Sequence, residues 1–140
     1  MTQPFYRRVD GYNFPFFAYD FDAALIRNAS ITITAPPGPG RIEAGFFIVD
    51  DVAASTPRNN NMVITVDGIV IFTGALYNYL GIVEAFVNTP WCSRYTTPTL
   101  SIFHWLTNID YESTAVIEFY NTTSPDPSLF RSAVFGRSGL

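Results

Sequence analysis

The sequence predicts an all-β fold: one antiparallel β-sandwich or jelly roll of seven or eight strands, with extended N- and C-terminal arms. Three observations predict it. Thr, Val, Ile, Phe and Tyr dominate the chain, and stretches of strong helix formers are sparse. Ten Pro and nine Gly interrupt the 140 residues at short intervals. Between these interruptions, short segments alternate apolar and polar residues, as half-buried strands do.

The first expected strands flank a proline-rich turn. "FFAYDF" (16–21) is the candidate for an eighth strand, and "ASITITA" (29–35) alternates strictly, with both of its Ile on one face. "APPGPG" (35–40) forbids regular structure and predicts a stiff turn. "RIEAGFFIV" (41–49) then reads as the next strand.

The clearest local signal is a hairpin. "MVITV" (62–66) and "IVIFT" (69–73) are joined by Asp67 and Gly68, which tolerate the positive φ angles of a tight type I′ turn. Three further strands complete the expected sandwich, at 81–88, 99–106 and 114–121.

The two ends of the chain define the expected division into segments. Residues 5–21 hold eight aromatic side chains, and "SPDP" opens a C-terminal stretch that is rich in apolar residues. Disordered tails have few aromatics and high charge, so neither end fits that class. We therefore expect an aromatic N-terminal arm or edge segment (1–28), a β-sandwich domain (29–123) and an extended C-terminal arm (124–140).

The apolar ends are the expected subunit interface. A sandwich of this size needs roughly 25–30 core residues, which the expected strands already supply. The side chains of both ends are then surplus, and a monomer would expose them as an unusually large apolar patch. Closure of the sandwich edges within one chain is the competing explanation. The expected interface residues are Phe5, Tyr6, Tyr12, Phe14, Phe16, Phe17, Leu129, Phe130, Val134 and Phe135.

Composition and charge exclude several partner classes. Charged residues make up only 14% of the chain, the net charge is −4 and every basic residue is an Arg. Such a chain is a poor ligand for phosphate backbones, so no nucleic-acid partner is expected. No apolar run reaches the roughly 18 residues of a membrane helix, and the N-terminus lacks the apolar region of a signal peptide. We expect a soluble protein with no membrane partner.

No catalytic, metal or cofactor site is expected. Cys92 and His104 are the only residues of their kinds, too few for a structural zinc site, and His104 fits a hydrogen-bonded packing role. The acidic pairs at 20/22, 50/51 and 110/112 match no calcium loop and fit solvated turns. Phosphate-binding loops and nucleophile elbows are also missing from the sequence. The chain is therefore expected not to be an enzyme and to need no cofactor.

A carbohydrate-binding surface is the alternative function. Aromatic faces stack on the apolar faces of sugars, so a lectin or phage adhesin domain could use such side chains as a platform. The candidate platform residues are Tyr77, Tyr79, Trp91 and Tyr95.

A lysine-free β-sandwich of this size with Pro-containing, aromatic ends resembles virion structural proteins. It is similar in organisation to the capsid decoration, or cementing, proteins of tailed phages and to small single-jelly-roll capsid subunits of tailless viruses. The resemblance covers the arm, strand and arm pattern of the whole chain. It implies a structural assembly protein of a virus particle that forms a homo-oligomer, with a trimer favoured, and clamps other capsid proteins through its arms.

Overall fold

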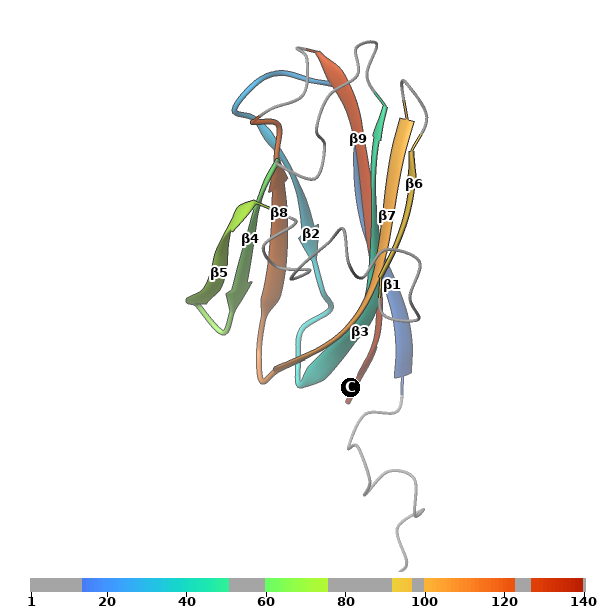
Figure 1. Cartoon of the computed structure of the whole chain (residues 1–140). Coiled ribbons are helices and arrows are strands. Elements are labelled where there is room, and N and C mark those ends of the chain that lie inside the picture. The colour runs from blue at the N-terminus through green and yellow to red at the C-terminus, as the bar shows by residue number, and fades with distance from the viewer. Residues whose placement is uncertain (1–13, 51–59, 76–91, 97–99, 123–126, 140) are drawn as a thin grey trace, which may run out of the picture.

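The computed structural model describes residues 14–50, 60–75, 92–96, 100–122 and 127–139. In these ranges the chain forms nine strands in two antiparallel sheets, which pack face to face (Figure 1). The strands are β1 (Phe14–Leu25), β2 (Ser30–Thr34), β3 (Gly40–Asp50), β4 (Asn61–Val66), β5 (Ile69–Ala75), β6 (Cys92–Thr96), β7 (Leu100–Tyr111), β8 (Ala115–Tyr120) and β9 (Ser128–Ser138). The predicted all-β sandwich is confirmed.

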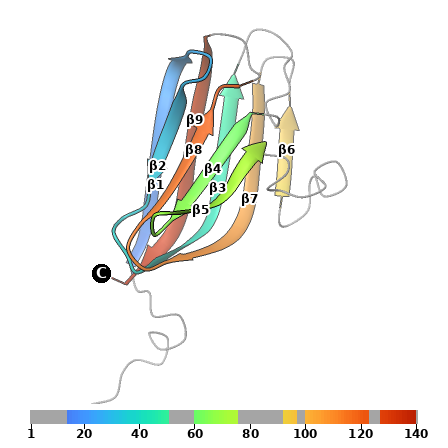
Figure 2. The same cartoon turned by 90° about the vertical axis from the view of Figure 1, so that its left-hand side faces the viewer.

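The sheets have five and four strands. The five-stranded sheet has the order β1-β9-β3-β7-β6, and the four-stranded sheet has the order β2-β8-β4-β5. Figure 2 shows the four-stranded sheet lying across the face of the other, with β6 at the far edge. The N-terminal strand β1 and the C-terminal strand β9 are therefore neighbours in one sheet.

The strands that were expected between residues 16 and 73, and again around 100–121, are all present. Most of their ends shift by one or two residues, but β1 and β7 continue beyond the expected ends, to Leu25 and Tyr111. Strand β6 and strand β9 were not expected. The strand expected at 81–88 lies outside the described residues. The count of nine accordingly exceeds the seven or eight strands predicted.

The expected C-terminal arm is wrong. Residues 128–138 form strand β9, which pairs with β1 on one side and with β3 on the other. Phe130 and Val134 are fully buried in the core of the sandwich. Described parts of all three predicted segments thus build one sandwich, and β9 is an internal strand of its five-stranded sheet.

The core lies between the two sheets and is built by alternation. In β8, and in β3 on either side of its bulge, every second residue is buried. Phe47 and Phe119 therefore meet from opposite sheets, with stacked rings whose centroids are 4.4 Å apart. Phe130 from β9 contacts the Phe47 ring edge-on at 5.4 Å. Offset and edge-on ring pairs add to the burial energy of these side chains.

Gly136 allows β9 to lie close to its neighbours. A Cβ atom at this position would collide with the carbonyl oxygen of Arg41 and with the ring of Phe16. Phe16 faces Gly136 across the β1–β9 pair, so its ring lies over the glycine. A residue without a side chain is needed here for close packing of the backbone.

The stiff turn expected at 35–40 carries the chain from one sheet to the other. Tyr111 lies over it, with its ring against Gly40 and its hydroxyl donating to the Pro36 carbonyl at 2.8 Å. Tyr111 is buried, so this hydrogen bond satisfies a polar atom that would otherwise be costly.

The predicted Asp-Gly turn is confirmed, and its carboxylate has a further role. Asp67 and Gly68 have positive φ angles of 51° and 81°, as a tight two-residue hairpin requires. The Asp67 carboxylate accepts backbone N–H bonds from Glu112, Ser113 and Thr114 at 2.7–3.0 Å. These bonds hold the pKa of Asp67 well below its usual range. The turn is thereby tied to the connection between β7 and β8.

Replacing Asp67 by Asn is expected to lower the free energy of unfolding at neutral pH. The pKa of Asp67 in the folded state lies below its value of about 4 in the unfolded chain. The contribution of the Asp67 carboxylate to stability is therefore complete above about pH 4, and it is lost as the pH falls toward the folded-state pKa. Urea unfolding at a series of pH values should show the difference between the two proteins shrinking in acid. Asp50→Asn is the matched control for loss of one charge. A difference that does not change with pH would contradict this role.

Candidate interaction surface

The outer faces of the two sheets differ in chemistry. On the four-stranded sheet, Tyr120 Oη donates to Glu118 Oε2 at 3.0 Å, and this bond raises the pKa of Tyr120. The rest of that sheet exposes a mixture of hydroxyl groups and apolar side chains, and the exposed apolar ones include Val70 and Ile71 of β5. The other outward residues with hydroxyls are Ser30, Thr32, Thr34, Thr65 and Thr73. The outer face of the five-stranded sheet is aromatic instead, and it is the candidate site.

Four rings form an outer aromatic cluster on that sheet: Phe17, Tyr19, Phe46 and Phe135. The Phe17 ring centroid lies 5.1 Å from that of Phe135 and 5.5 Å from that of Tyr19. Phe46 continues the row, 6.2 Å from Phe135. The exposed fractions are 53% for Phe17, 70% for Tyr19 and 41% for Phe135. Large apolar rings in contact with one another are thus left in solvent.

Strand pairing explains why these rings meet. Phe17 of β1 faces Phe135 of β9, and residues that face each other across a pair lie on one side of the sheet. Ala133 faces Tyr19 on one side and Phe46 on the other. Although Ala133 belongs to the outer face, it is fully buried, because the flanking aromatic side chains cover it.

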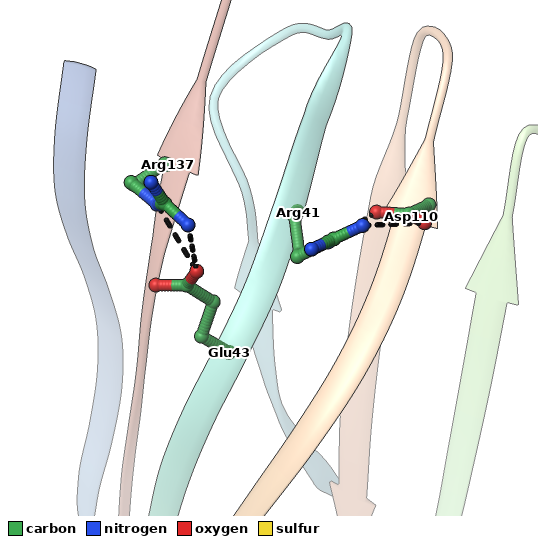
Figure 3. Close-up of polar contacts among 4 residues, drawn as sticks. All are labelled: Arg41, Glu43, Asp110 and Arg137. Atoms are coloured by element: carbon green, nitrogen blue, oxygen red, sulfur yellow. Dashed lines mark hydrogen bonds and ion pairs between the residues drawn. The ribbon is translucent and has the colours of Figure 1, made fainter. Parts of the chain in front are cut away.

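Two ion pairs border the cluster at one end. Figure 3 shows Arg137 of β9 paired with Glu43 of β3, and Arg41 of β3 paired with Asp110 of β7, each with a shortest distance of 2.6 Å. The β3 register shifts between Ile42 and Ala44, so Glu43 is the extra residue of a β-bulge, a feature that re-aims side chains. These pairs are partly exposed, so each contributes at most about 1 kcal/mol to stability.

Arg131 borders the cluster at the other end. Its guanidinium lies 5.1 Å from the centroid of the Phe21 ring, within the range of a cation–π contact. An apolar centre flanked by Arg side chains and ion pairs has the make-up of protein–protein interfaces, in which aromatics and Arg are enriched.

The structure divides the predicted interface residues. Phe14, Phe17 and Phe135 are exposed and Leu129 is half-buried. Phe130 and Val134 are not available to a partner, and Phe16 is only partly so. Phe130 and Val134 are fully buried, and Phe16 points inward at the sheet edge, because alternate residues of β1 and β9 face the core. Phe5, Tyr6 and Tyr12 lie outside the described residues.

The expected glycan platform stays a prediction. Tyr77, Tyr79 and Trp91 lie outside the described residues, and Tyr95 lies in β6, where side chains are not described.

The sequence interpretation missed two members of the cluster, Tyr19 and Phe46. Adjacent Phe46 and Phe47 had to point to opposite faces of any strand, so the pair itself signalled one outward ring. His104 was expected to be a packing residue, and that is wrong. It faces Phe46 across the β3–β7 pair and is exposed, because this position belongs to the outer face.

The two Asn-x-Ser/Thr sequences differ in access. Asn28 is exposed in a turn with a φ angle of 67°. Asn121 is fully buried, and its Nδ2 atom, the one that would carry a glycan, donates to the Leu25 carbonyl at 2.9 Å. Asn121 is therefore closed to glycosylation in the folded chain.

No protein-family model and no curated protein matches this chain. Among the described residues, no group of three or more His, Cys, Asp or Glu side chains could hold a metal ion. In the same parts of the chain, no helix is long and apolar enough to cross a membrane. The outer aromatic cluster and its borders remain as the basis for a functional argument.

Proposed function

We propose that this chain is a structural assembly protein of a virus particle, either a capsid decoration (cementing) protein or a small capsid subunit. It acts by contact and not by catalysis. The observation that carries the proposal is the outer aromatic cluster, a row of four rings in contact with one another of which three are exposed on one sheet face. Exposed apolar patches of this kind mark protein-contact sites.

The partners that we propose are further copies of the chain and other capsid proteins. The resemblance to virion proteins favours a trimer, and the virion is the proposed location. Nucleic acid is a poor candidate, because the net charge is −4 and Arg41 and Arg137 are engaged with carboxylates. Since β9 belongs to the sheet, the contact surface that we propose is the sheet face and not a C-terminal arm.

The free energy of association sets a lower limit on the area of the proposed contact. The rings of the cluster are already partly covered, so completing their burial is worth about 1 kcal/mol each, against 1.5–3 for a whole side chain. Association costs about 4–15 kcal/mol in lost freedom. The cluster alone is therefore too small, and the partner must also cover the bordering Arg residues and ion pairs, within the roughly 1,200–2,000 Å² of a standard interface.

Replacing both Phe17 and Phe135 by Ser is expected to weaken assembly by about tenfold or more, as loss of interface anchors does. Native mass spectrometry over a concentration series measures the effect. Both side chains are about half exposed, so the variant should keep its melting temperature within a few degrees.

The matched control replaces Val70 and Ile71 by Ser, which removes two equally exposed apolar side chains from β5. We expect this control to assemble like the wild type. Equal assembly of the cluster variant and the wild type, or a loss confined to the β5 variant, would contradict the proposed surface.

A further inference from the structure

The free edge of β1 can be read from the hydrogen bonds of its neighbours. The Phe46 carbonyl accepts a bond from Ser132 Oγ at 2.6 Å, so this carbonyl faces β9 and its partner Ala133 faces β3. The backbone N–H and C=O groups of successive residues in a strand point to opposite neighbours. The backbone groups of Ser132 therefore point to β1, where Ser132 pairs with Asp20. The backbone groups of even-numbered residues of β1 therefore bond to β9, and those of odd-numbered residues point to the free edge.

A second observation agrees with this assignment. The N–H of Phe21 donates to the Asp20 carboxylate at 2.8 Å, as expected for a group that points away from β9. The same carboxylate accepts the N–H of Thr32 from the edge of β2 at 2.8 Å. The Asp20 carboxylate thus satisfies one edge N–H group of each sheet, that of Phe21 in β1 and that of Thr32 in β2.

Within the described part of the chain, only a short stretch of the β1 edge is open. Pro15 has no N–H to offer, and the N–H of Phe21 is already bonded. Between them, the backbone groups of Phe17 and Tyr19 face outward, and no described strand other than β9 pairs with β1. These two residues also carry exposed rings of the outer aromatic cluster. An edge of this kind is a template for pairing with another chain.

We propose that β1 pairs antiparallel with β1 of a second copy about a two-fold axis at Ala18. This inference rests on the proposed assembly function and specifies one of its contacts. In this register Phe17 faces Tyr19 of the second copy, and the two such pairs form four backbone hydrogen bonds. Their side chains lie on the same outer face, where aromatic cross-strand pairs add stability.

The edge is complementary to itself, which is why a second copy is the occupant. The same two-fold places Pro15 opposite Phe21, so a residue with no N–H faces one whose N–H is already bonded, and no N–H group is left without a partner. Ala18 falls on the axis, in a pair where Cα atoms approach to about 4.5 Å and a small side chain is an advantage. Because of the two-fold symmetry, the same match occurs at both ends of the paired segment.

The contact is isologous, so it joins copies two by two. The paired strands cover less than the roughly 1,200–2,000 Å² of a stable complex, so the edge contact adds to other contacts and does not replace them. Both five-stranded sheets become one continuous sheet whose outer aromatic clusters lie on the same side. That face stays open for the different contact that a trimer requires.

Cysteine cross-linking tests the axis. If the axis is correct, Ala18→Cys in a Cys92→Ser background brings the Cα atoms of two cysteines to about 4.5 Å, within the 4.4–6.8 Å range of a disulfide. Ala24→Cys is the matched control, since the same register separates its two copies by about 40 Å along the strands. In a glutathione buffer, the first variant should become a reducible dimer on a denaturing gel and the second should stay monomeric.

Proline substitution tests the backbone bonds. Tyr19→Pro removes an N–H that faces the free edge, whereas Tyr19→Val removes the same ring and keeps the N–H. In the Ala18→Cys background, the proline variant should cross-link about tenfold more slowly than the valine variant, because each copy loses one hydrogen bond. Far-UV circular dichroism checks that both variants keep the β fold.

Cross-linking of Ala18→Cys no faster than that of Ala24→Cys, or equal rates for the proline and valine variants, would overturn the edge pairing. Sedimentation of the unmodified chain then separates the two proposals. An oligomer without cross-linking leaves the assembly function standing and removes this contact, whereas a monomer at every concentration removes both.

Discussion

Deletion of residues 128–140 is expected to leave a chain that does not fold. The deletion removes β9, which lies between β1 and β3 and pairs with both along most of its length. Without it, β1 has no partner strand and the core loses Phe130 and Val134, both fully buried. Losing Phe130 alone should cost about 3–5 kcal/mol, a large part of the 5–15 kcal/mol that stabilises a typical domain.

Circular dichroism and proteolysis of the truncated chain measure this outcome. Arg131→Ala is a control within the same strand, because its side chain is exposed on the outer face, and it should fold normally. A truncated protein that keeps its β spectrum and unfolds cooperatively would show that the segment is an appendage after all.

Phe47→Ala is expected to destabilise the folded state by about 3–5 kcal/mol, because it removes a fully buried ring that contacts Phe119 and Phe130. The melting temperature should fall by roughly 10–20 °C in a chain of this size. Differential scanning calorimetry measures both quantities.

Its neighbour in the sequence supplies the matched control. Phe46→Ala removes the same side chain from the outer face, where the ring is only half-buried, and should cost about 1 kcal/mol. Equal destabilisation by the two substitutions would contradict the assignment of Phe47 to the core and of Phe46 to the surface.

The sequence predicted most strands because their signals are local. The Asp-Gly turn requires positive φ angles, and the segment around 30–34 alternates strictly, so both were found at their places. Strand β9 was missed for a physical reason. Its inward residues include Ser132, Gly136 and Ser138, and one of its outward residues is Phe135, so the alternation of apolar and polar residues is absent.

The error at the C-terminus also changed the expected interface. With β9 taken as an arm, Phe130 and Val134 appeared surplus to the core. Once β9 belongs to the sheet, these side chains fill the core, and the remaining surplus is the outer aromatic cluster. Sequence alternation separates Phe16 from Phe17, but only the packing of the second sheet decides which of the two faces is outside.

Sedimentation velocity of the unmodified chain over a dilution series tests the central claim most directly, namely that the aromatic face of the five-stranded sheet makes contact with neighbours. We expect the sedimentation coefficient to rise with concentration and to reach that of a defined oligomer, and the Phe17→Ser/Phe135→Ser variant to stay at a lower value. A single monomeric species at every concentration would contradict the claim.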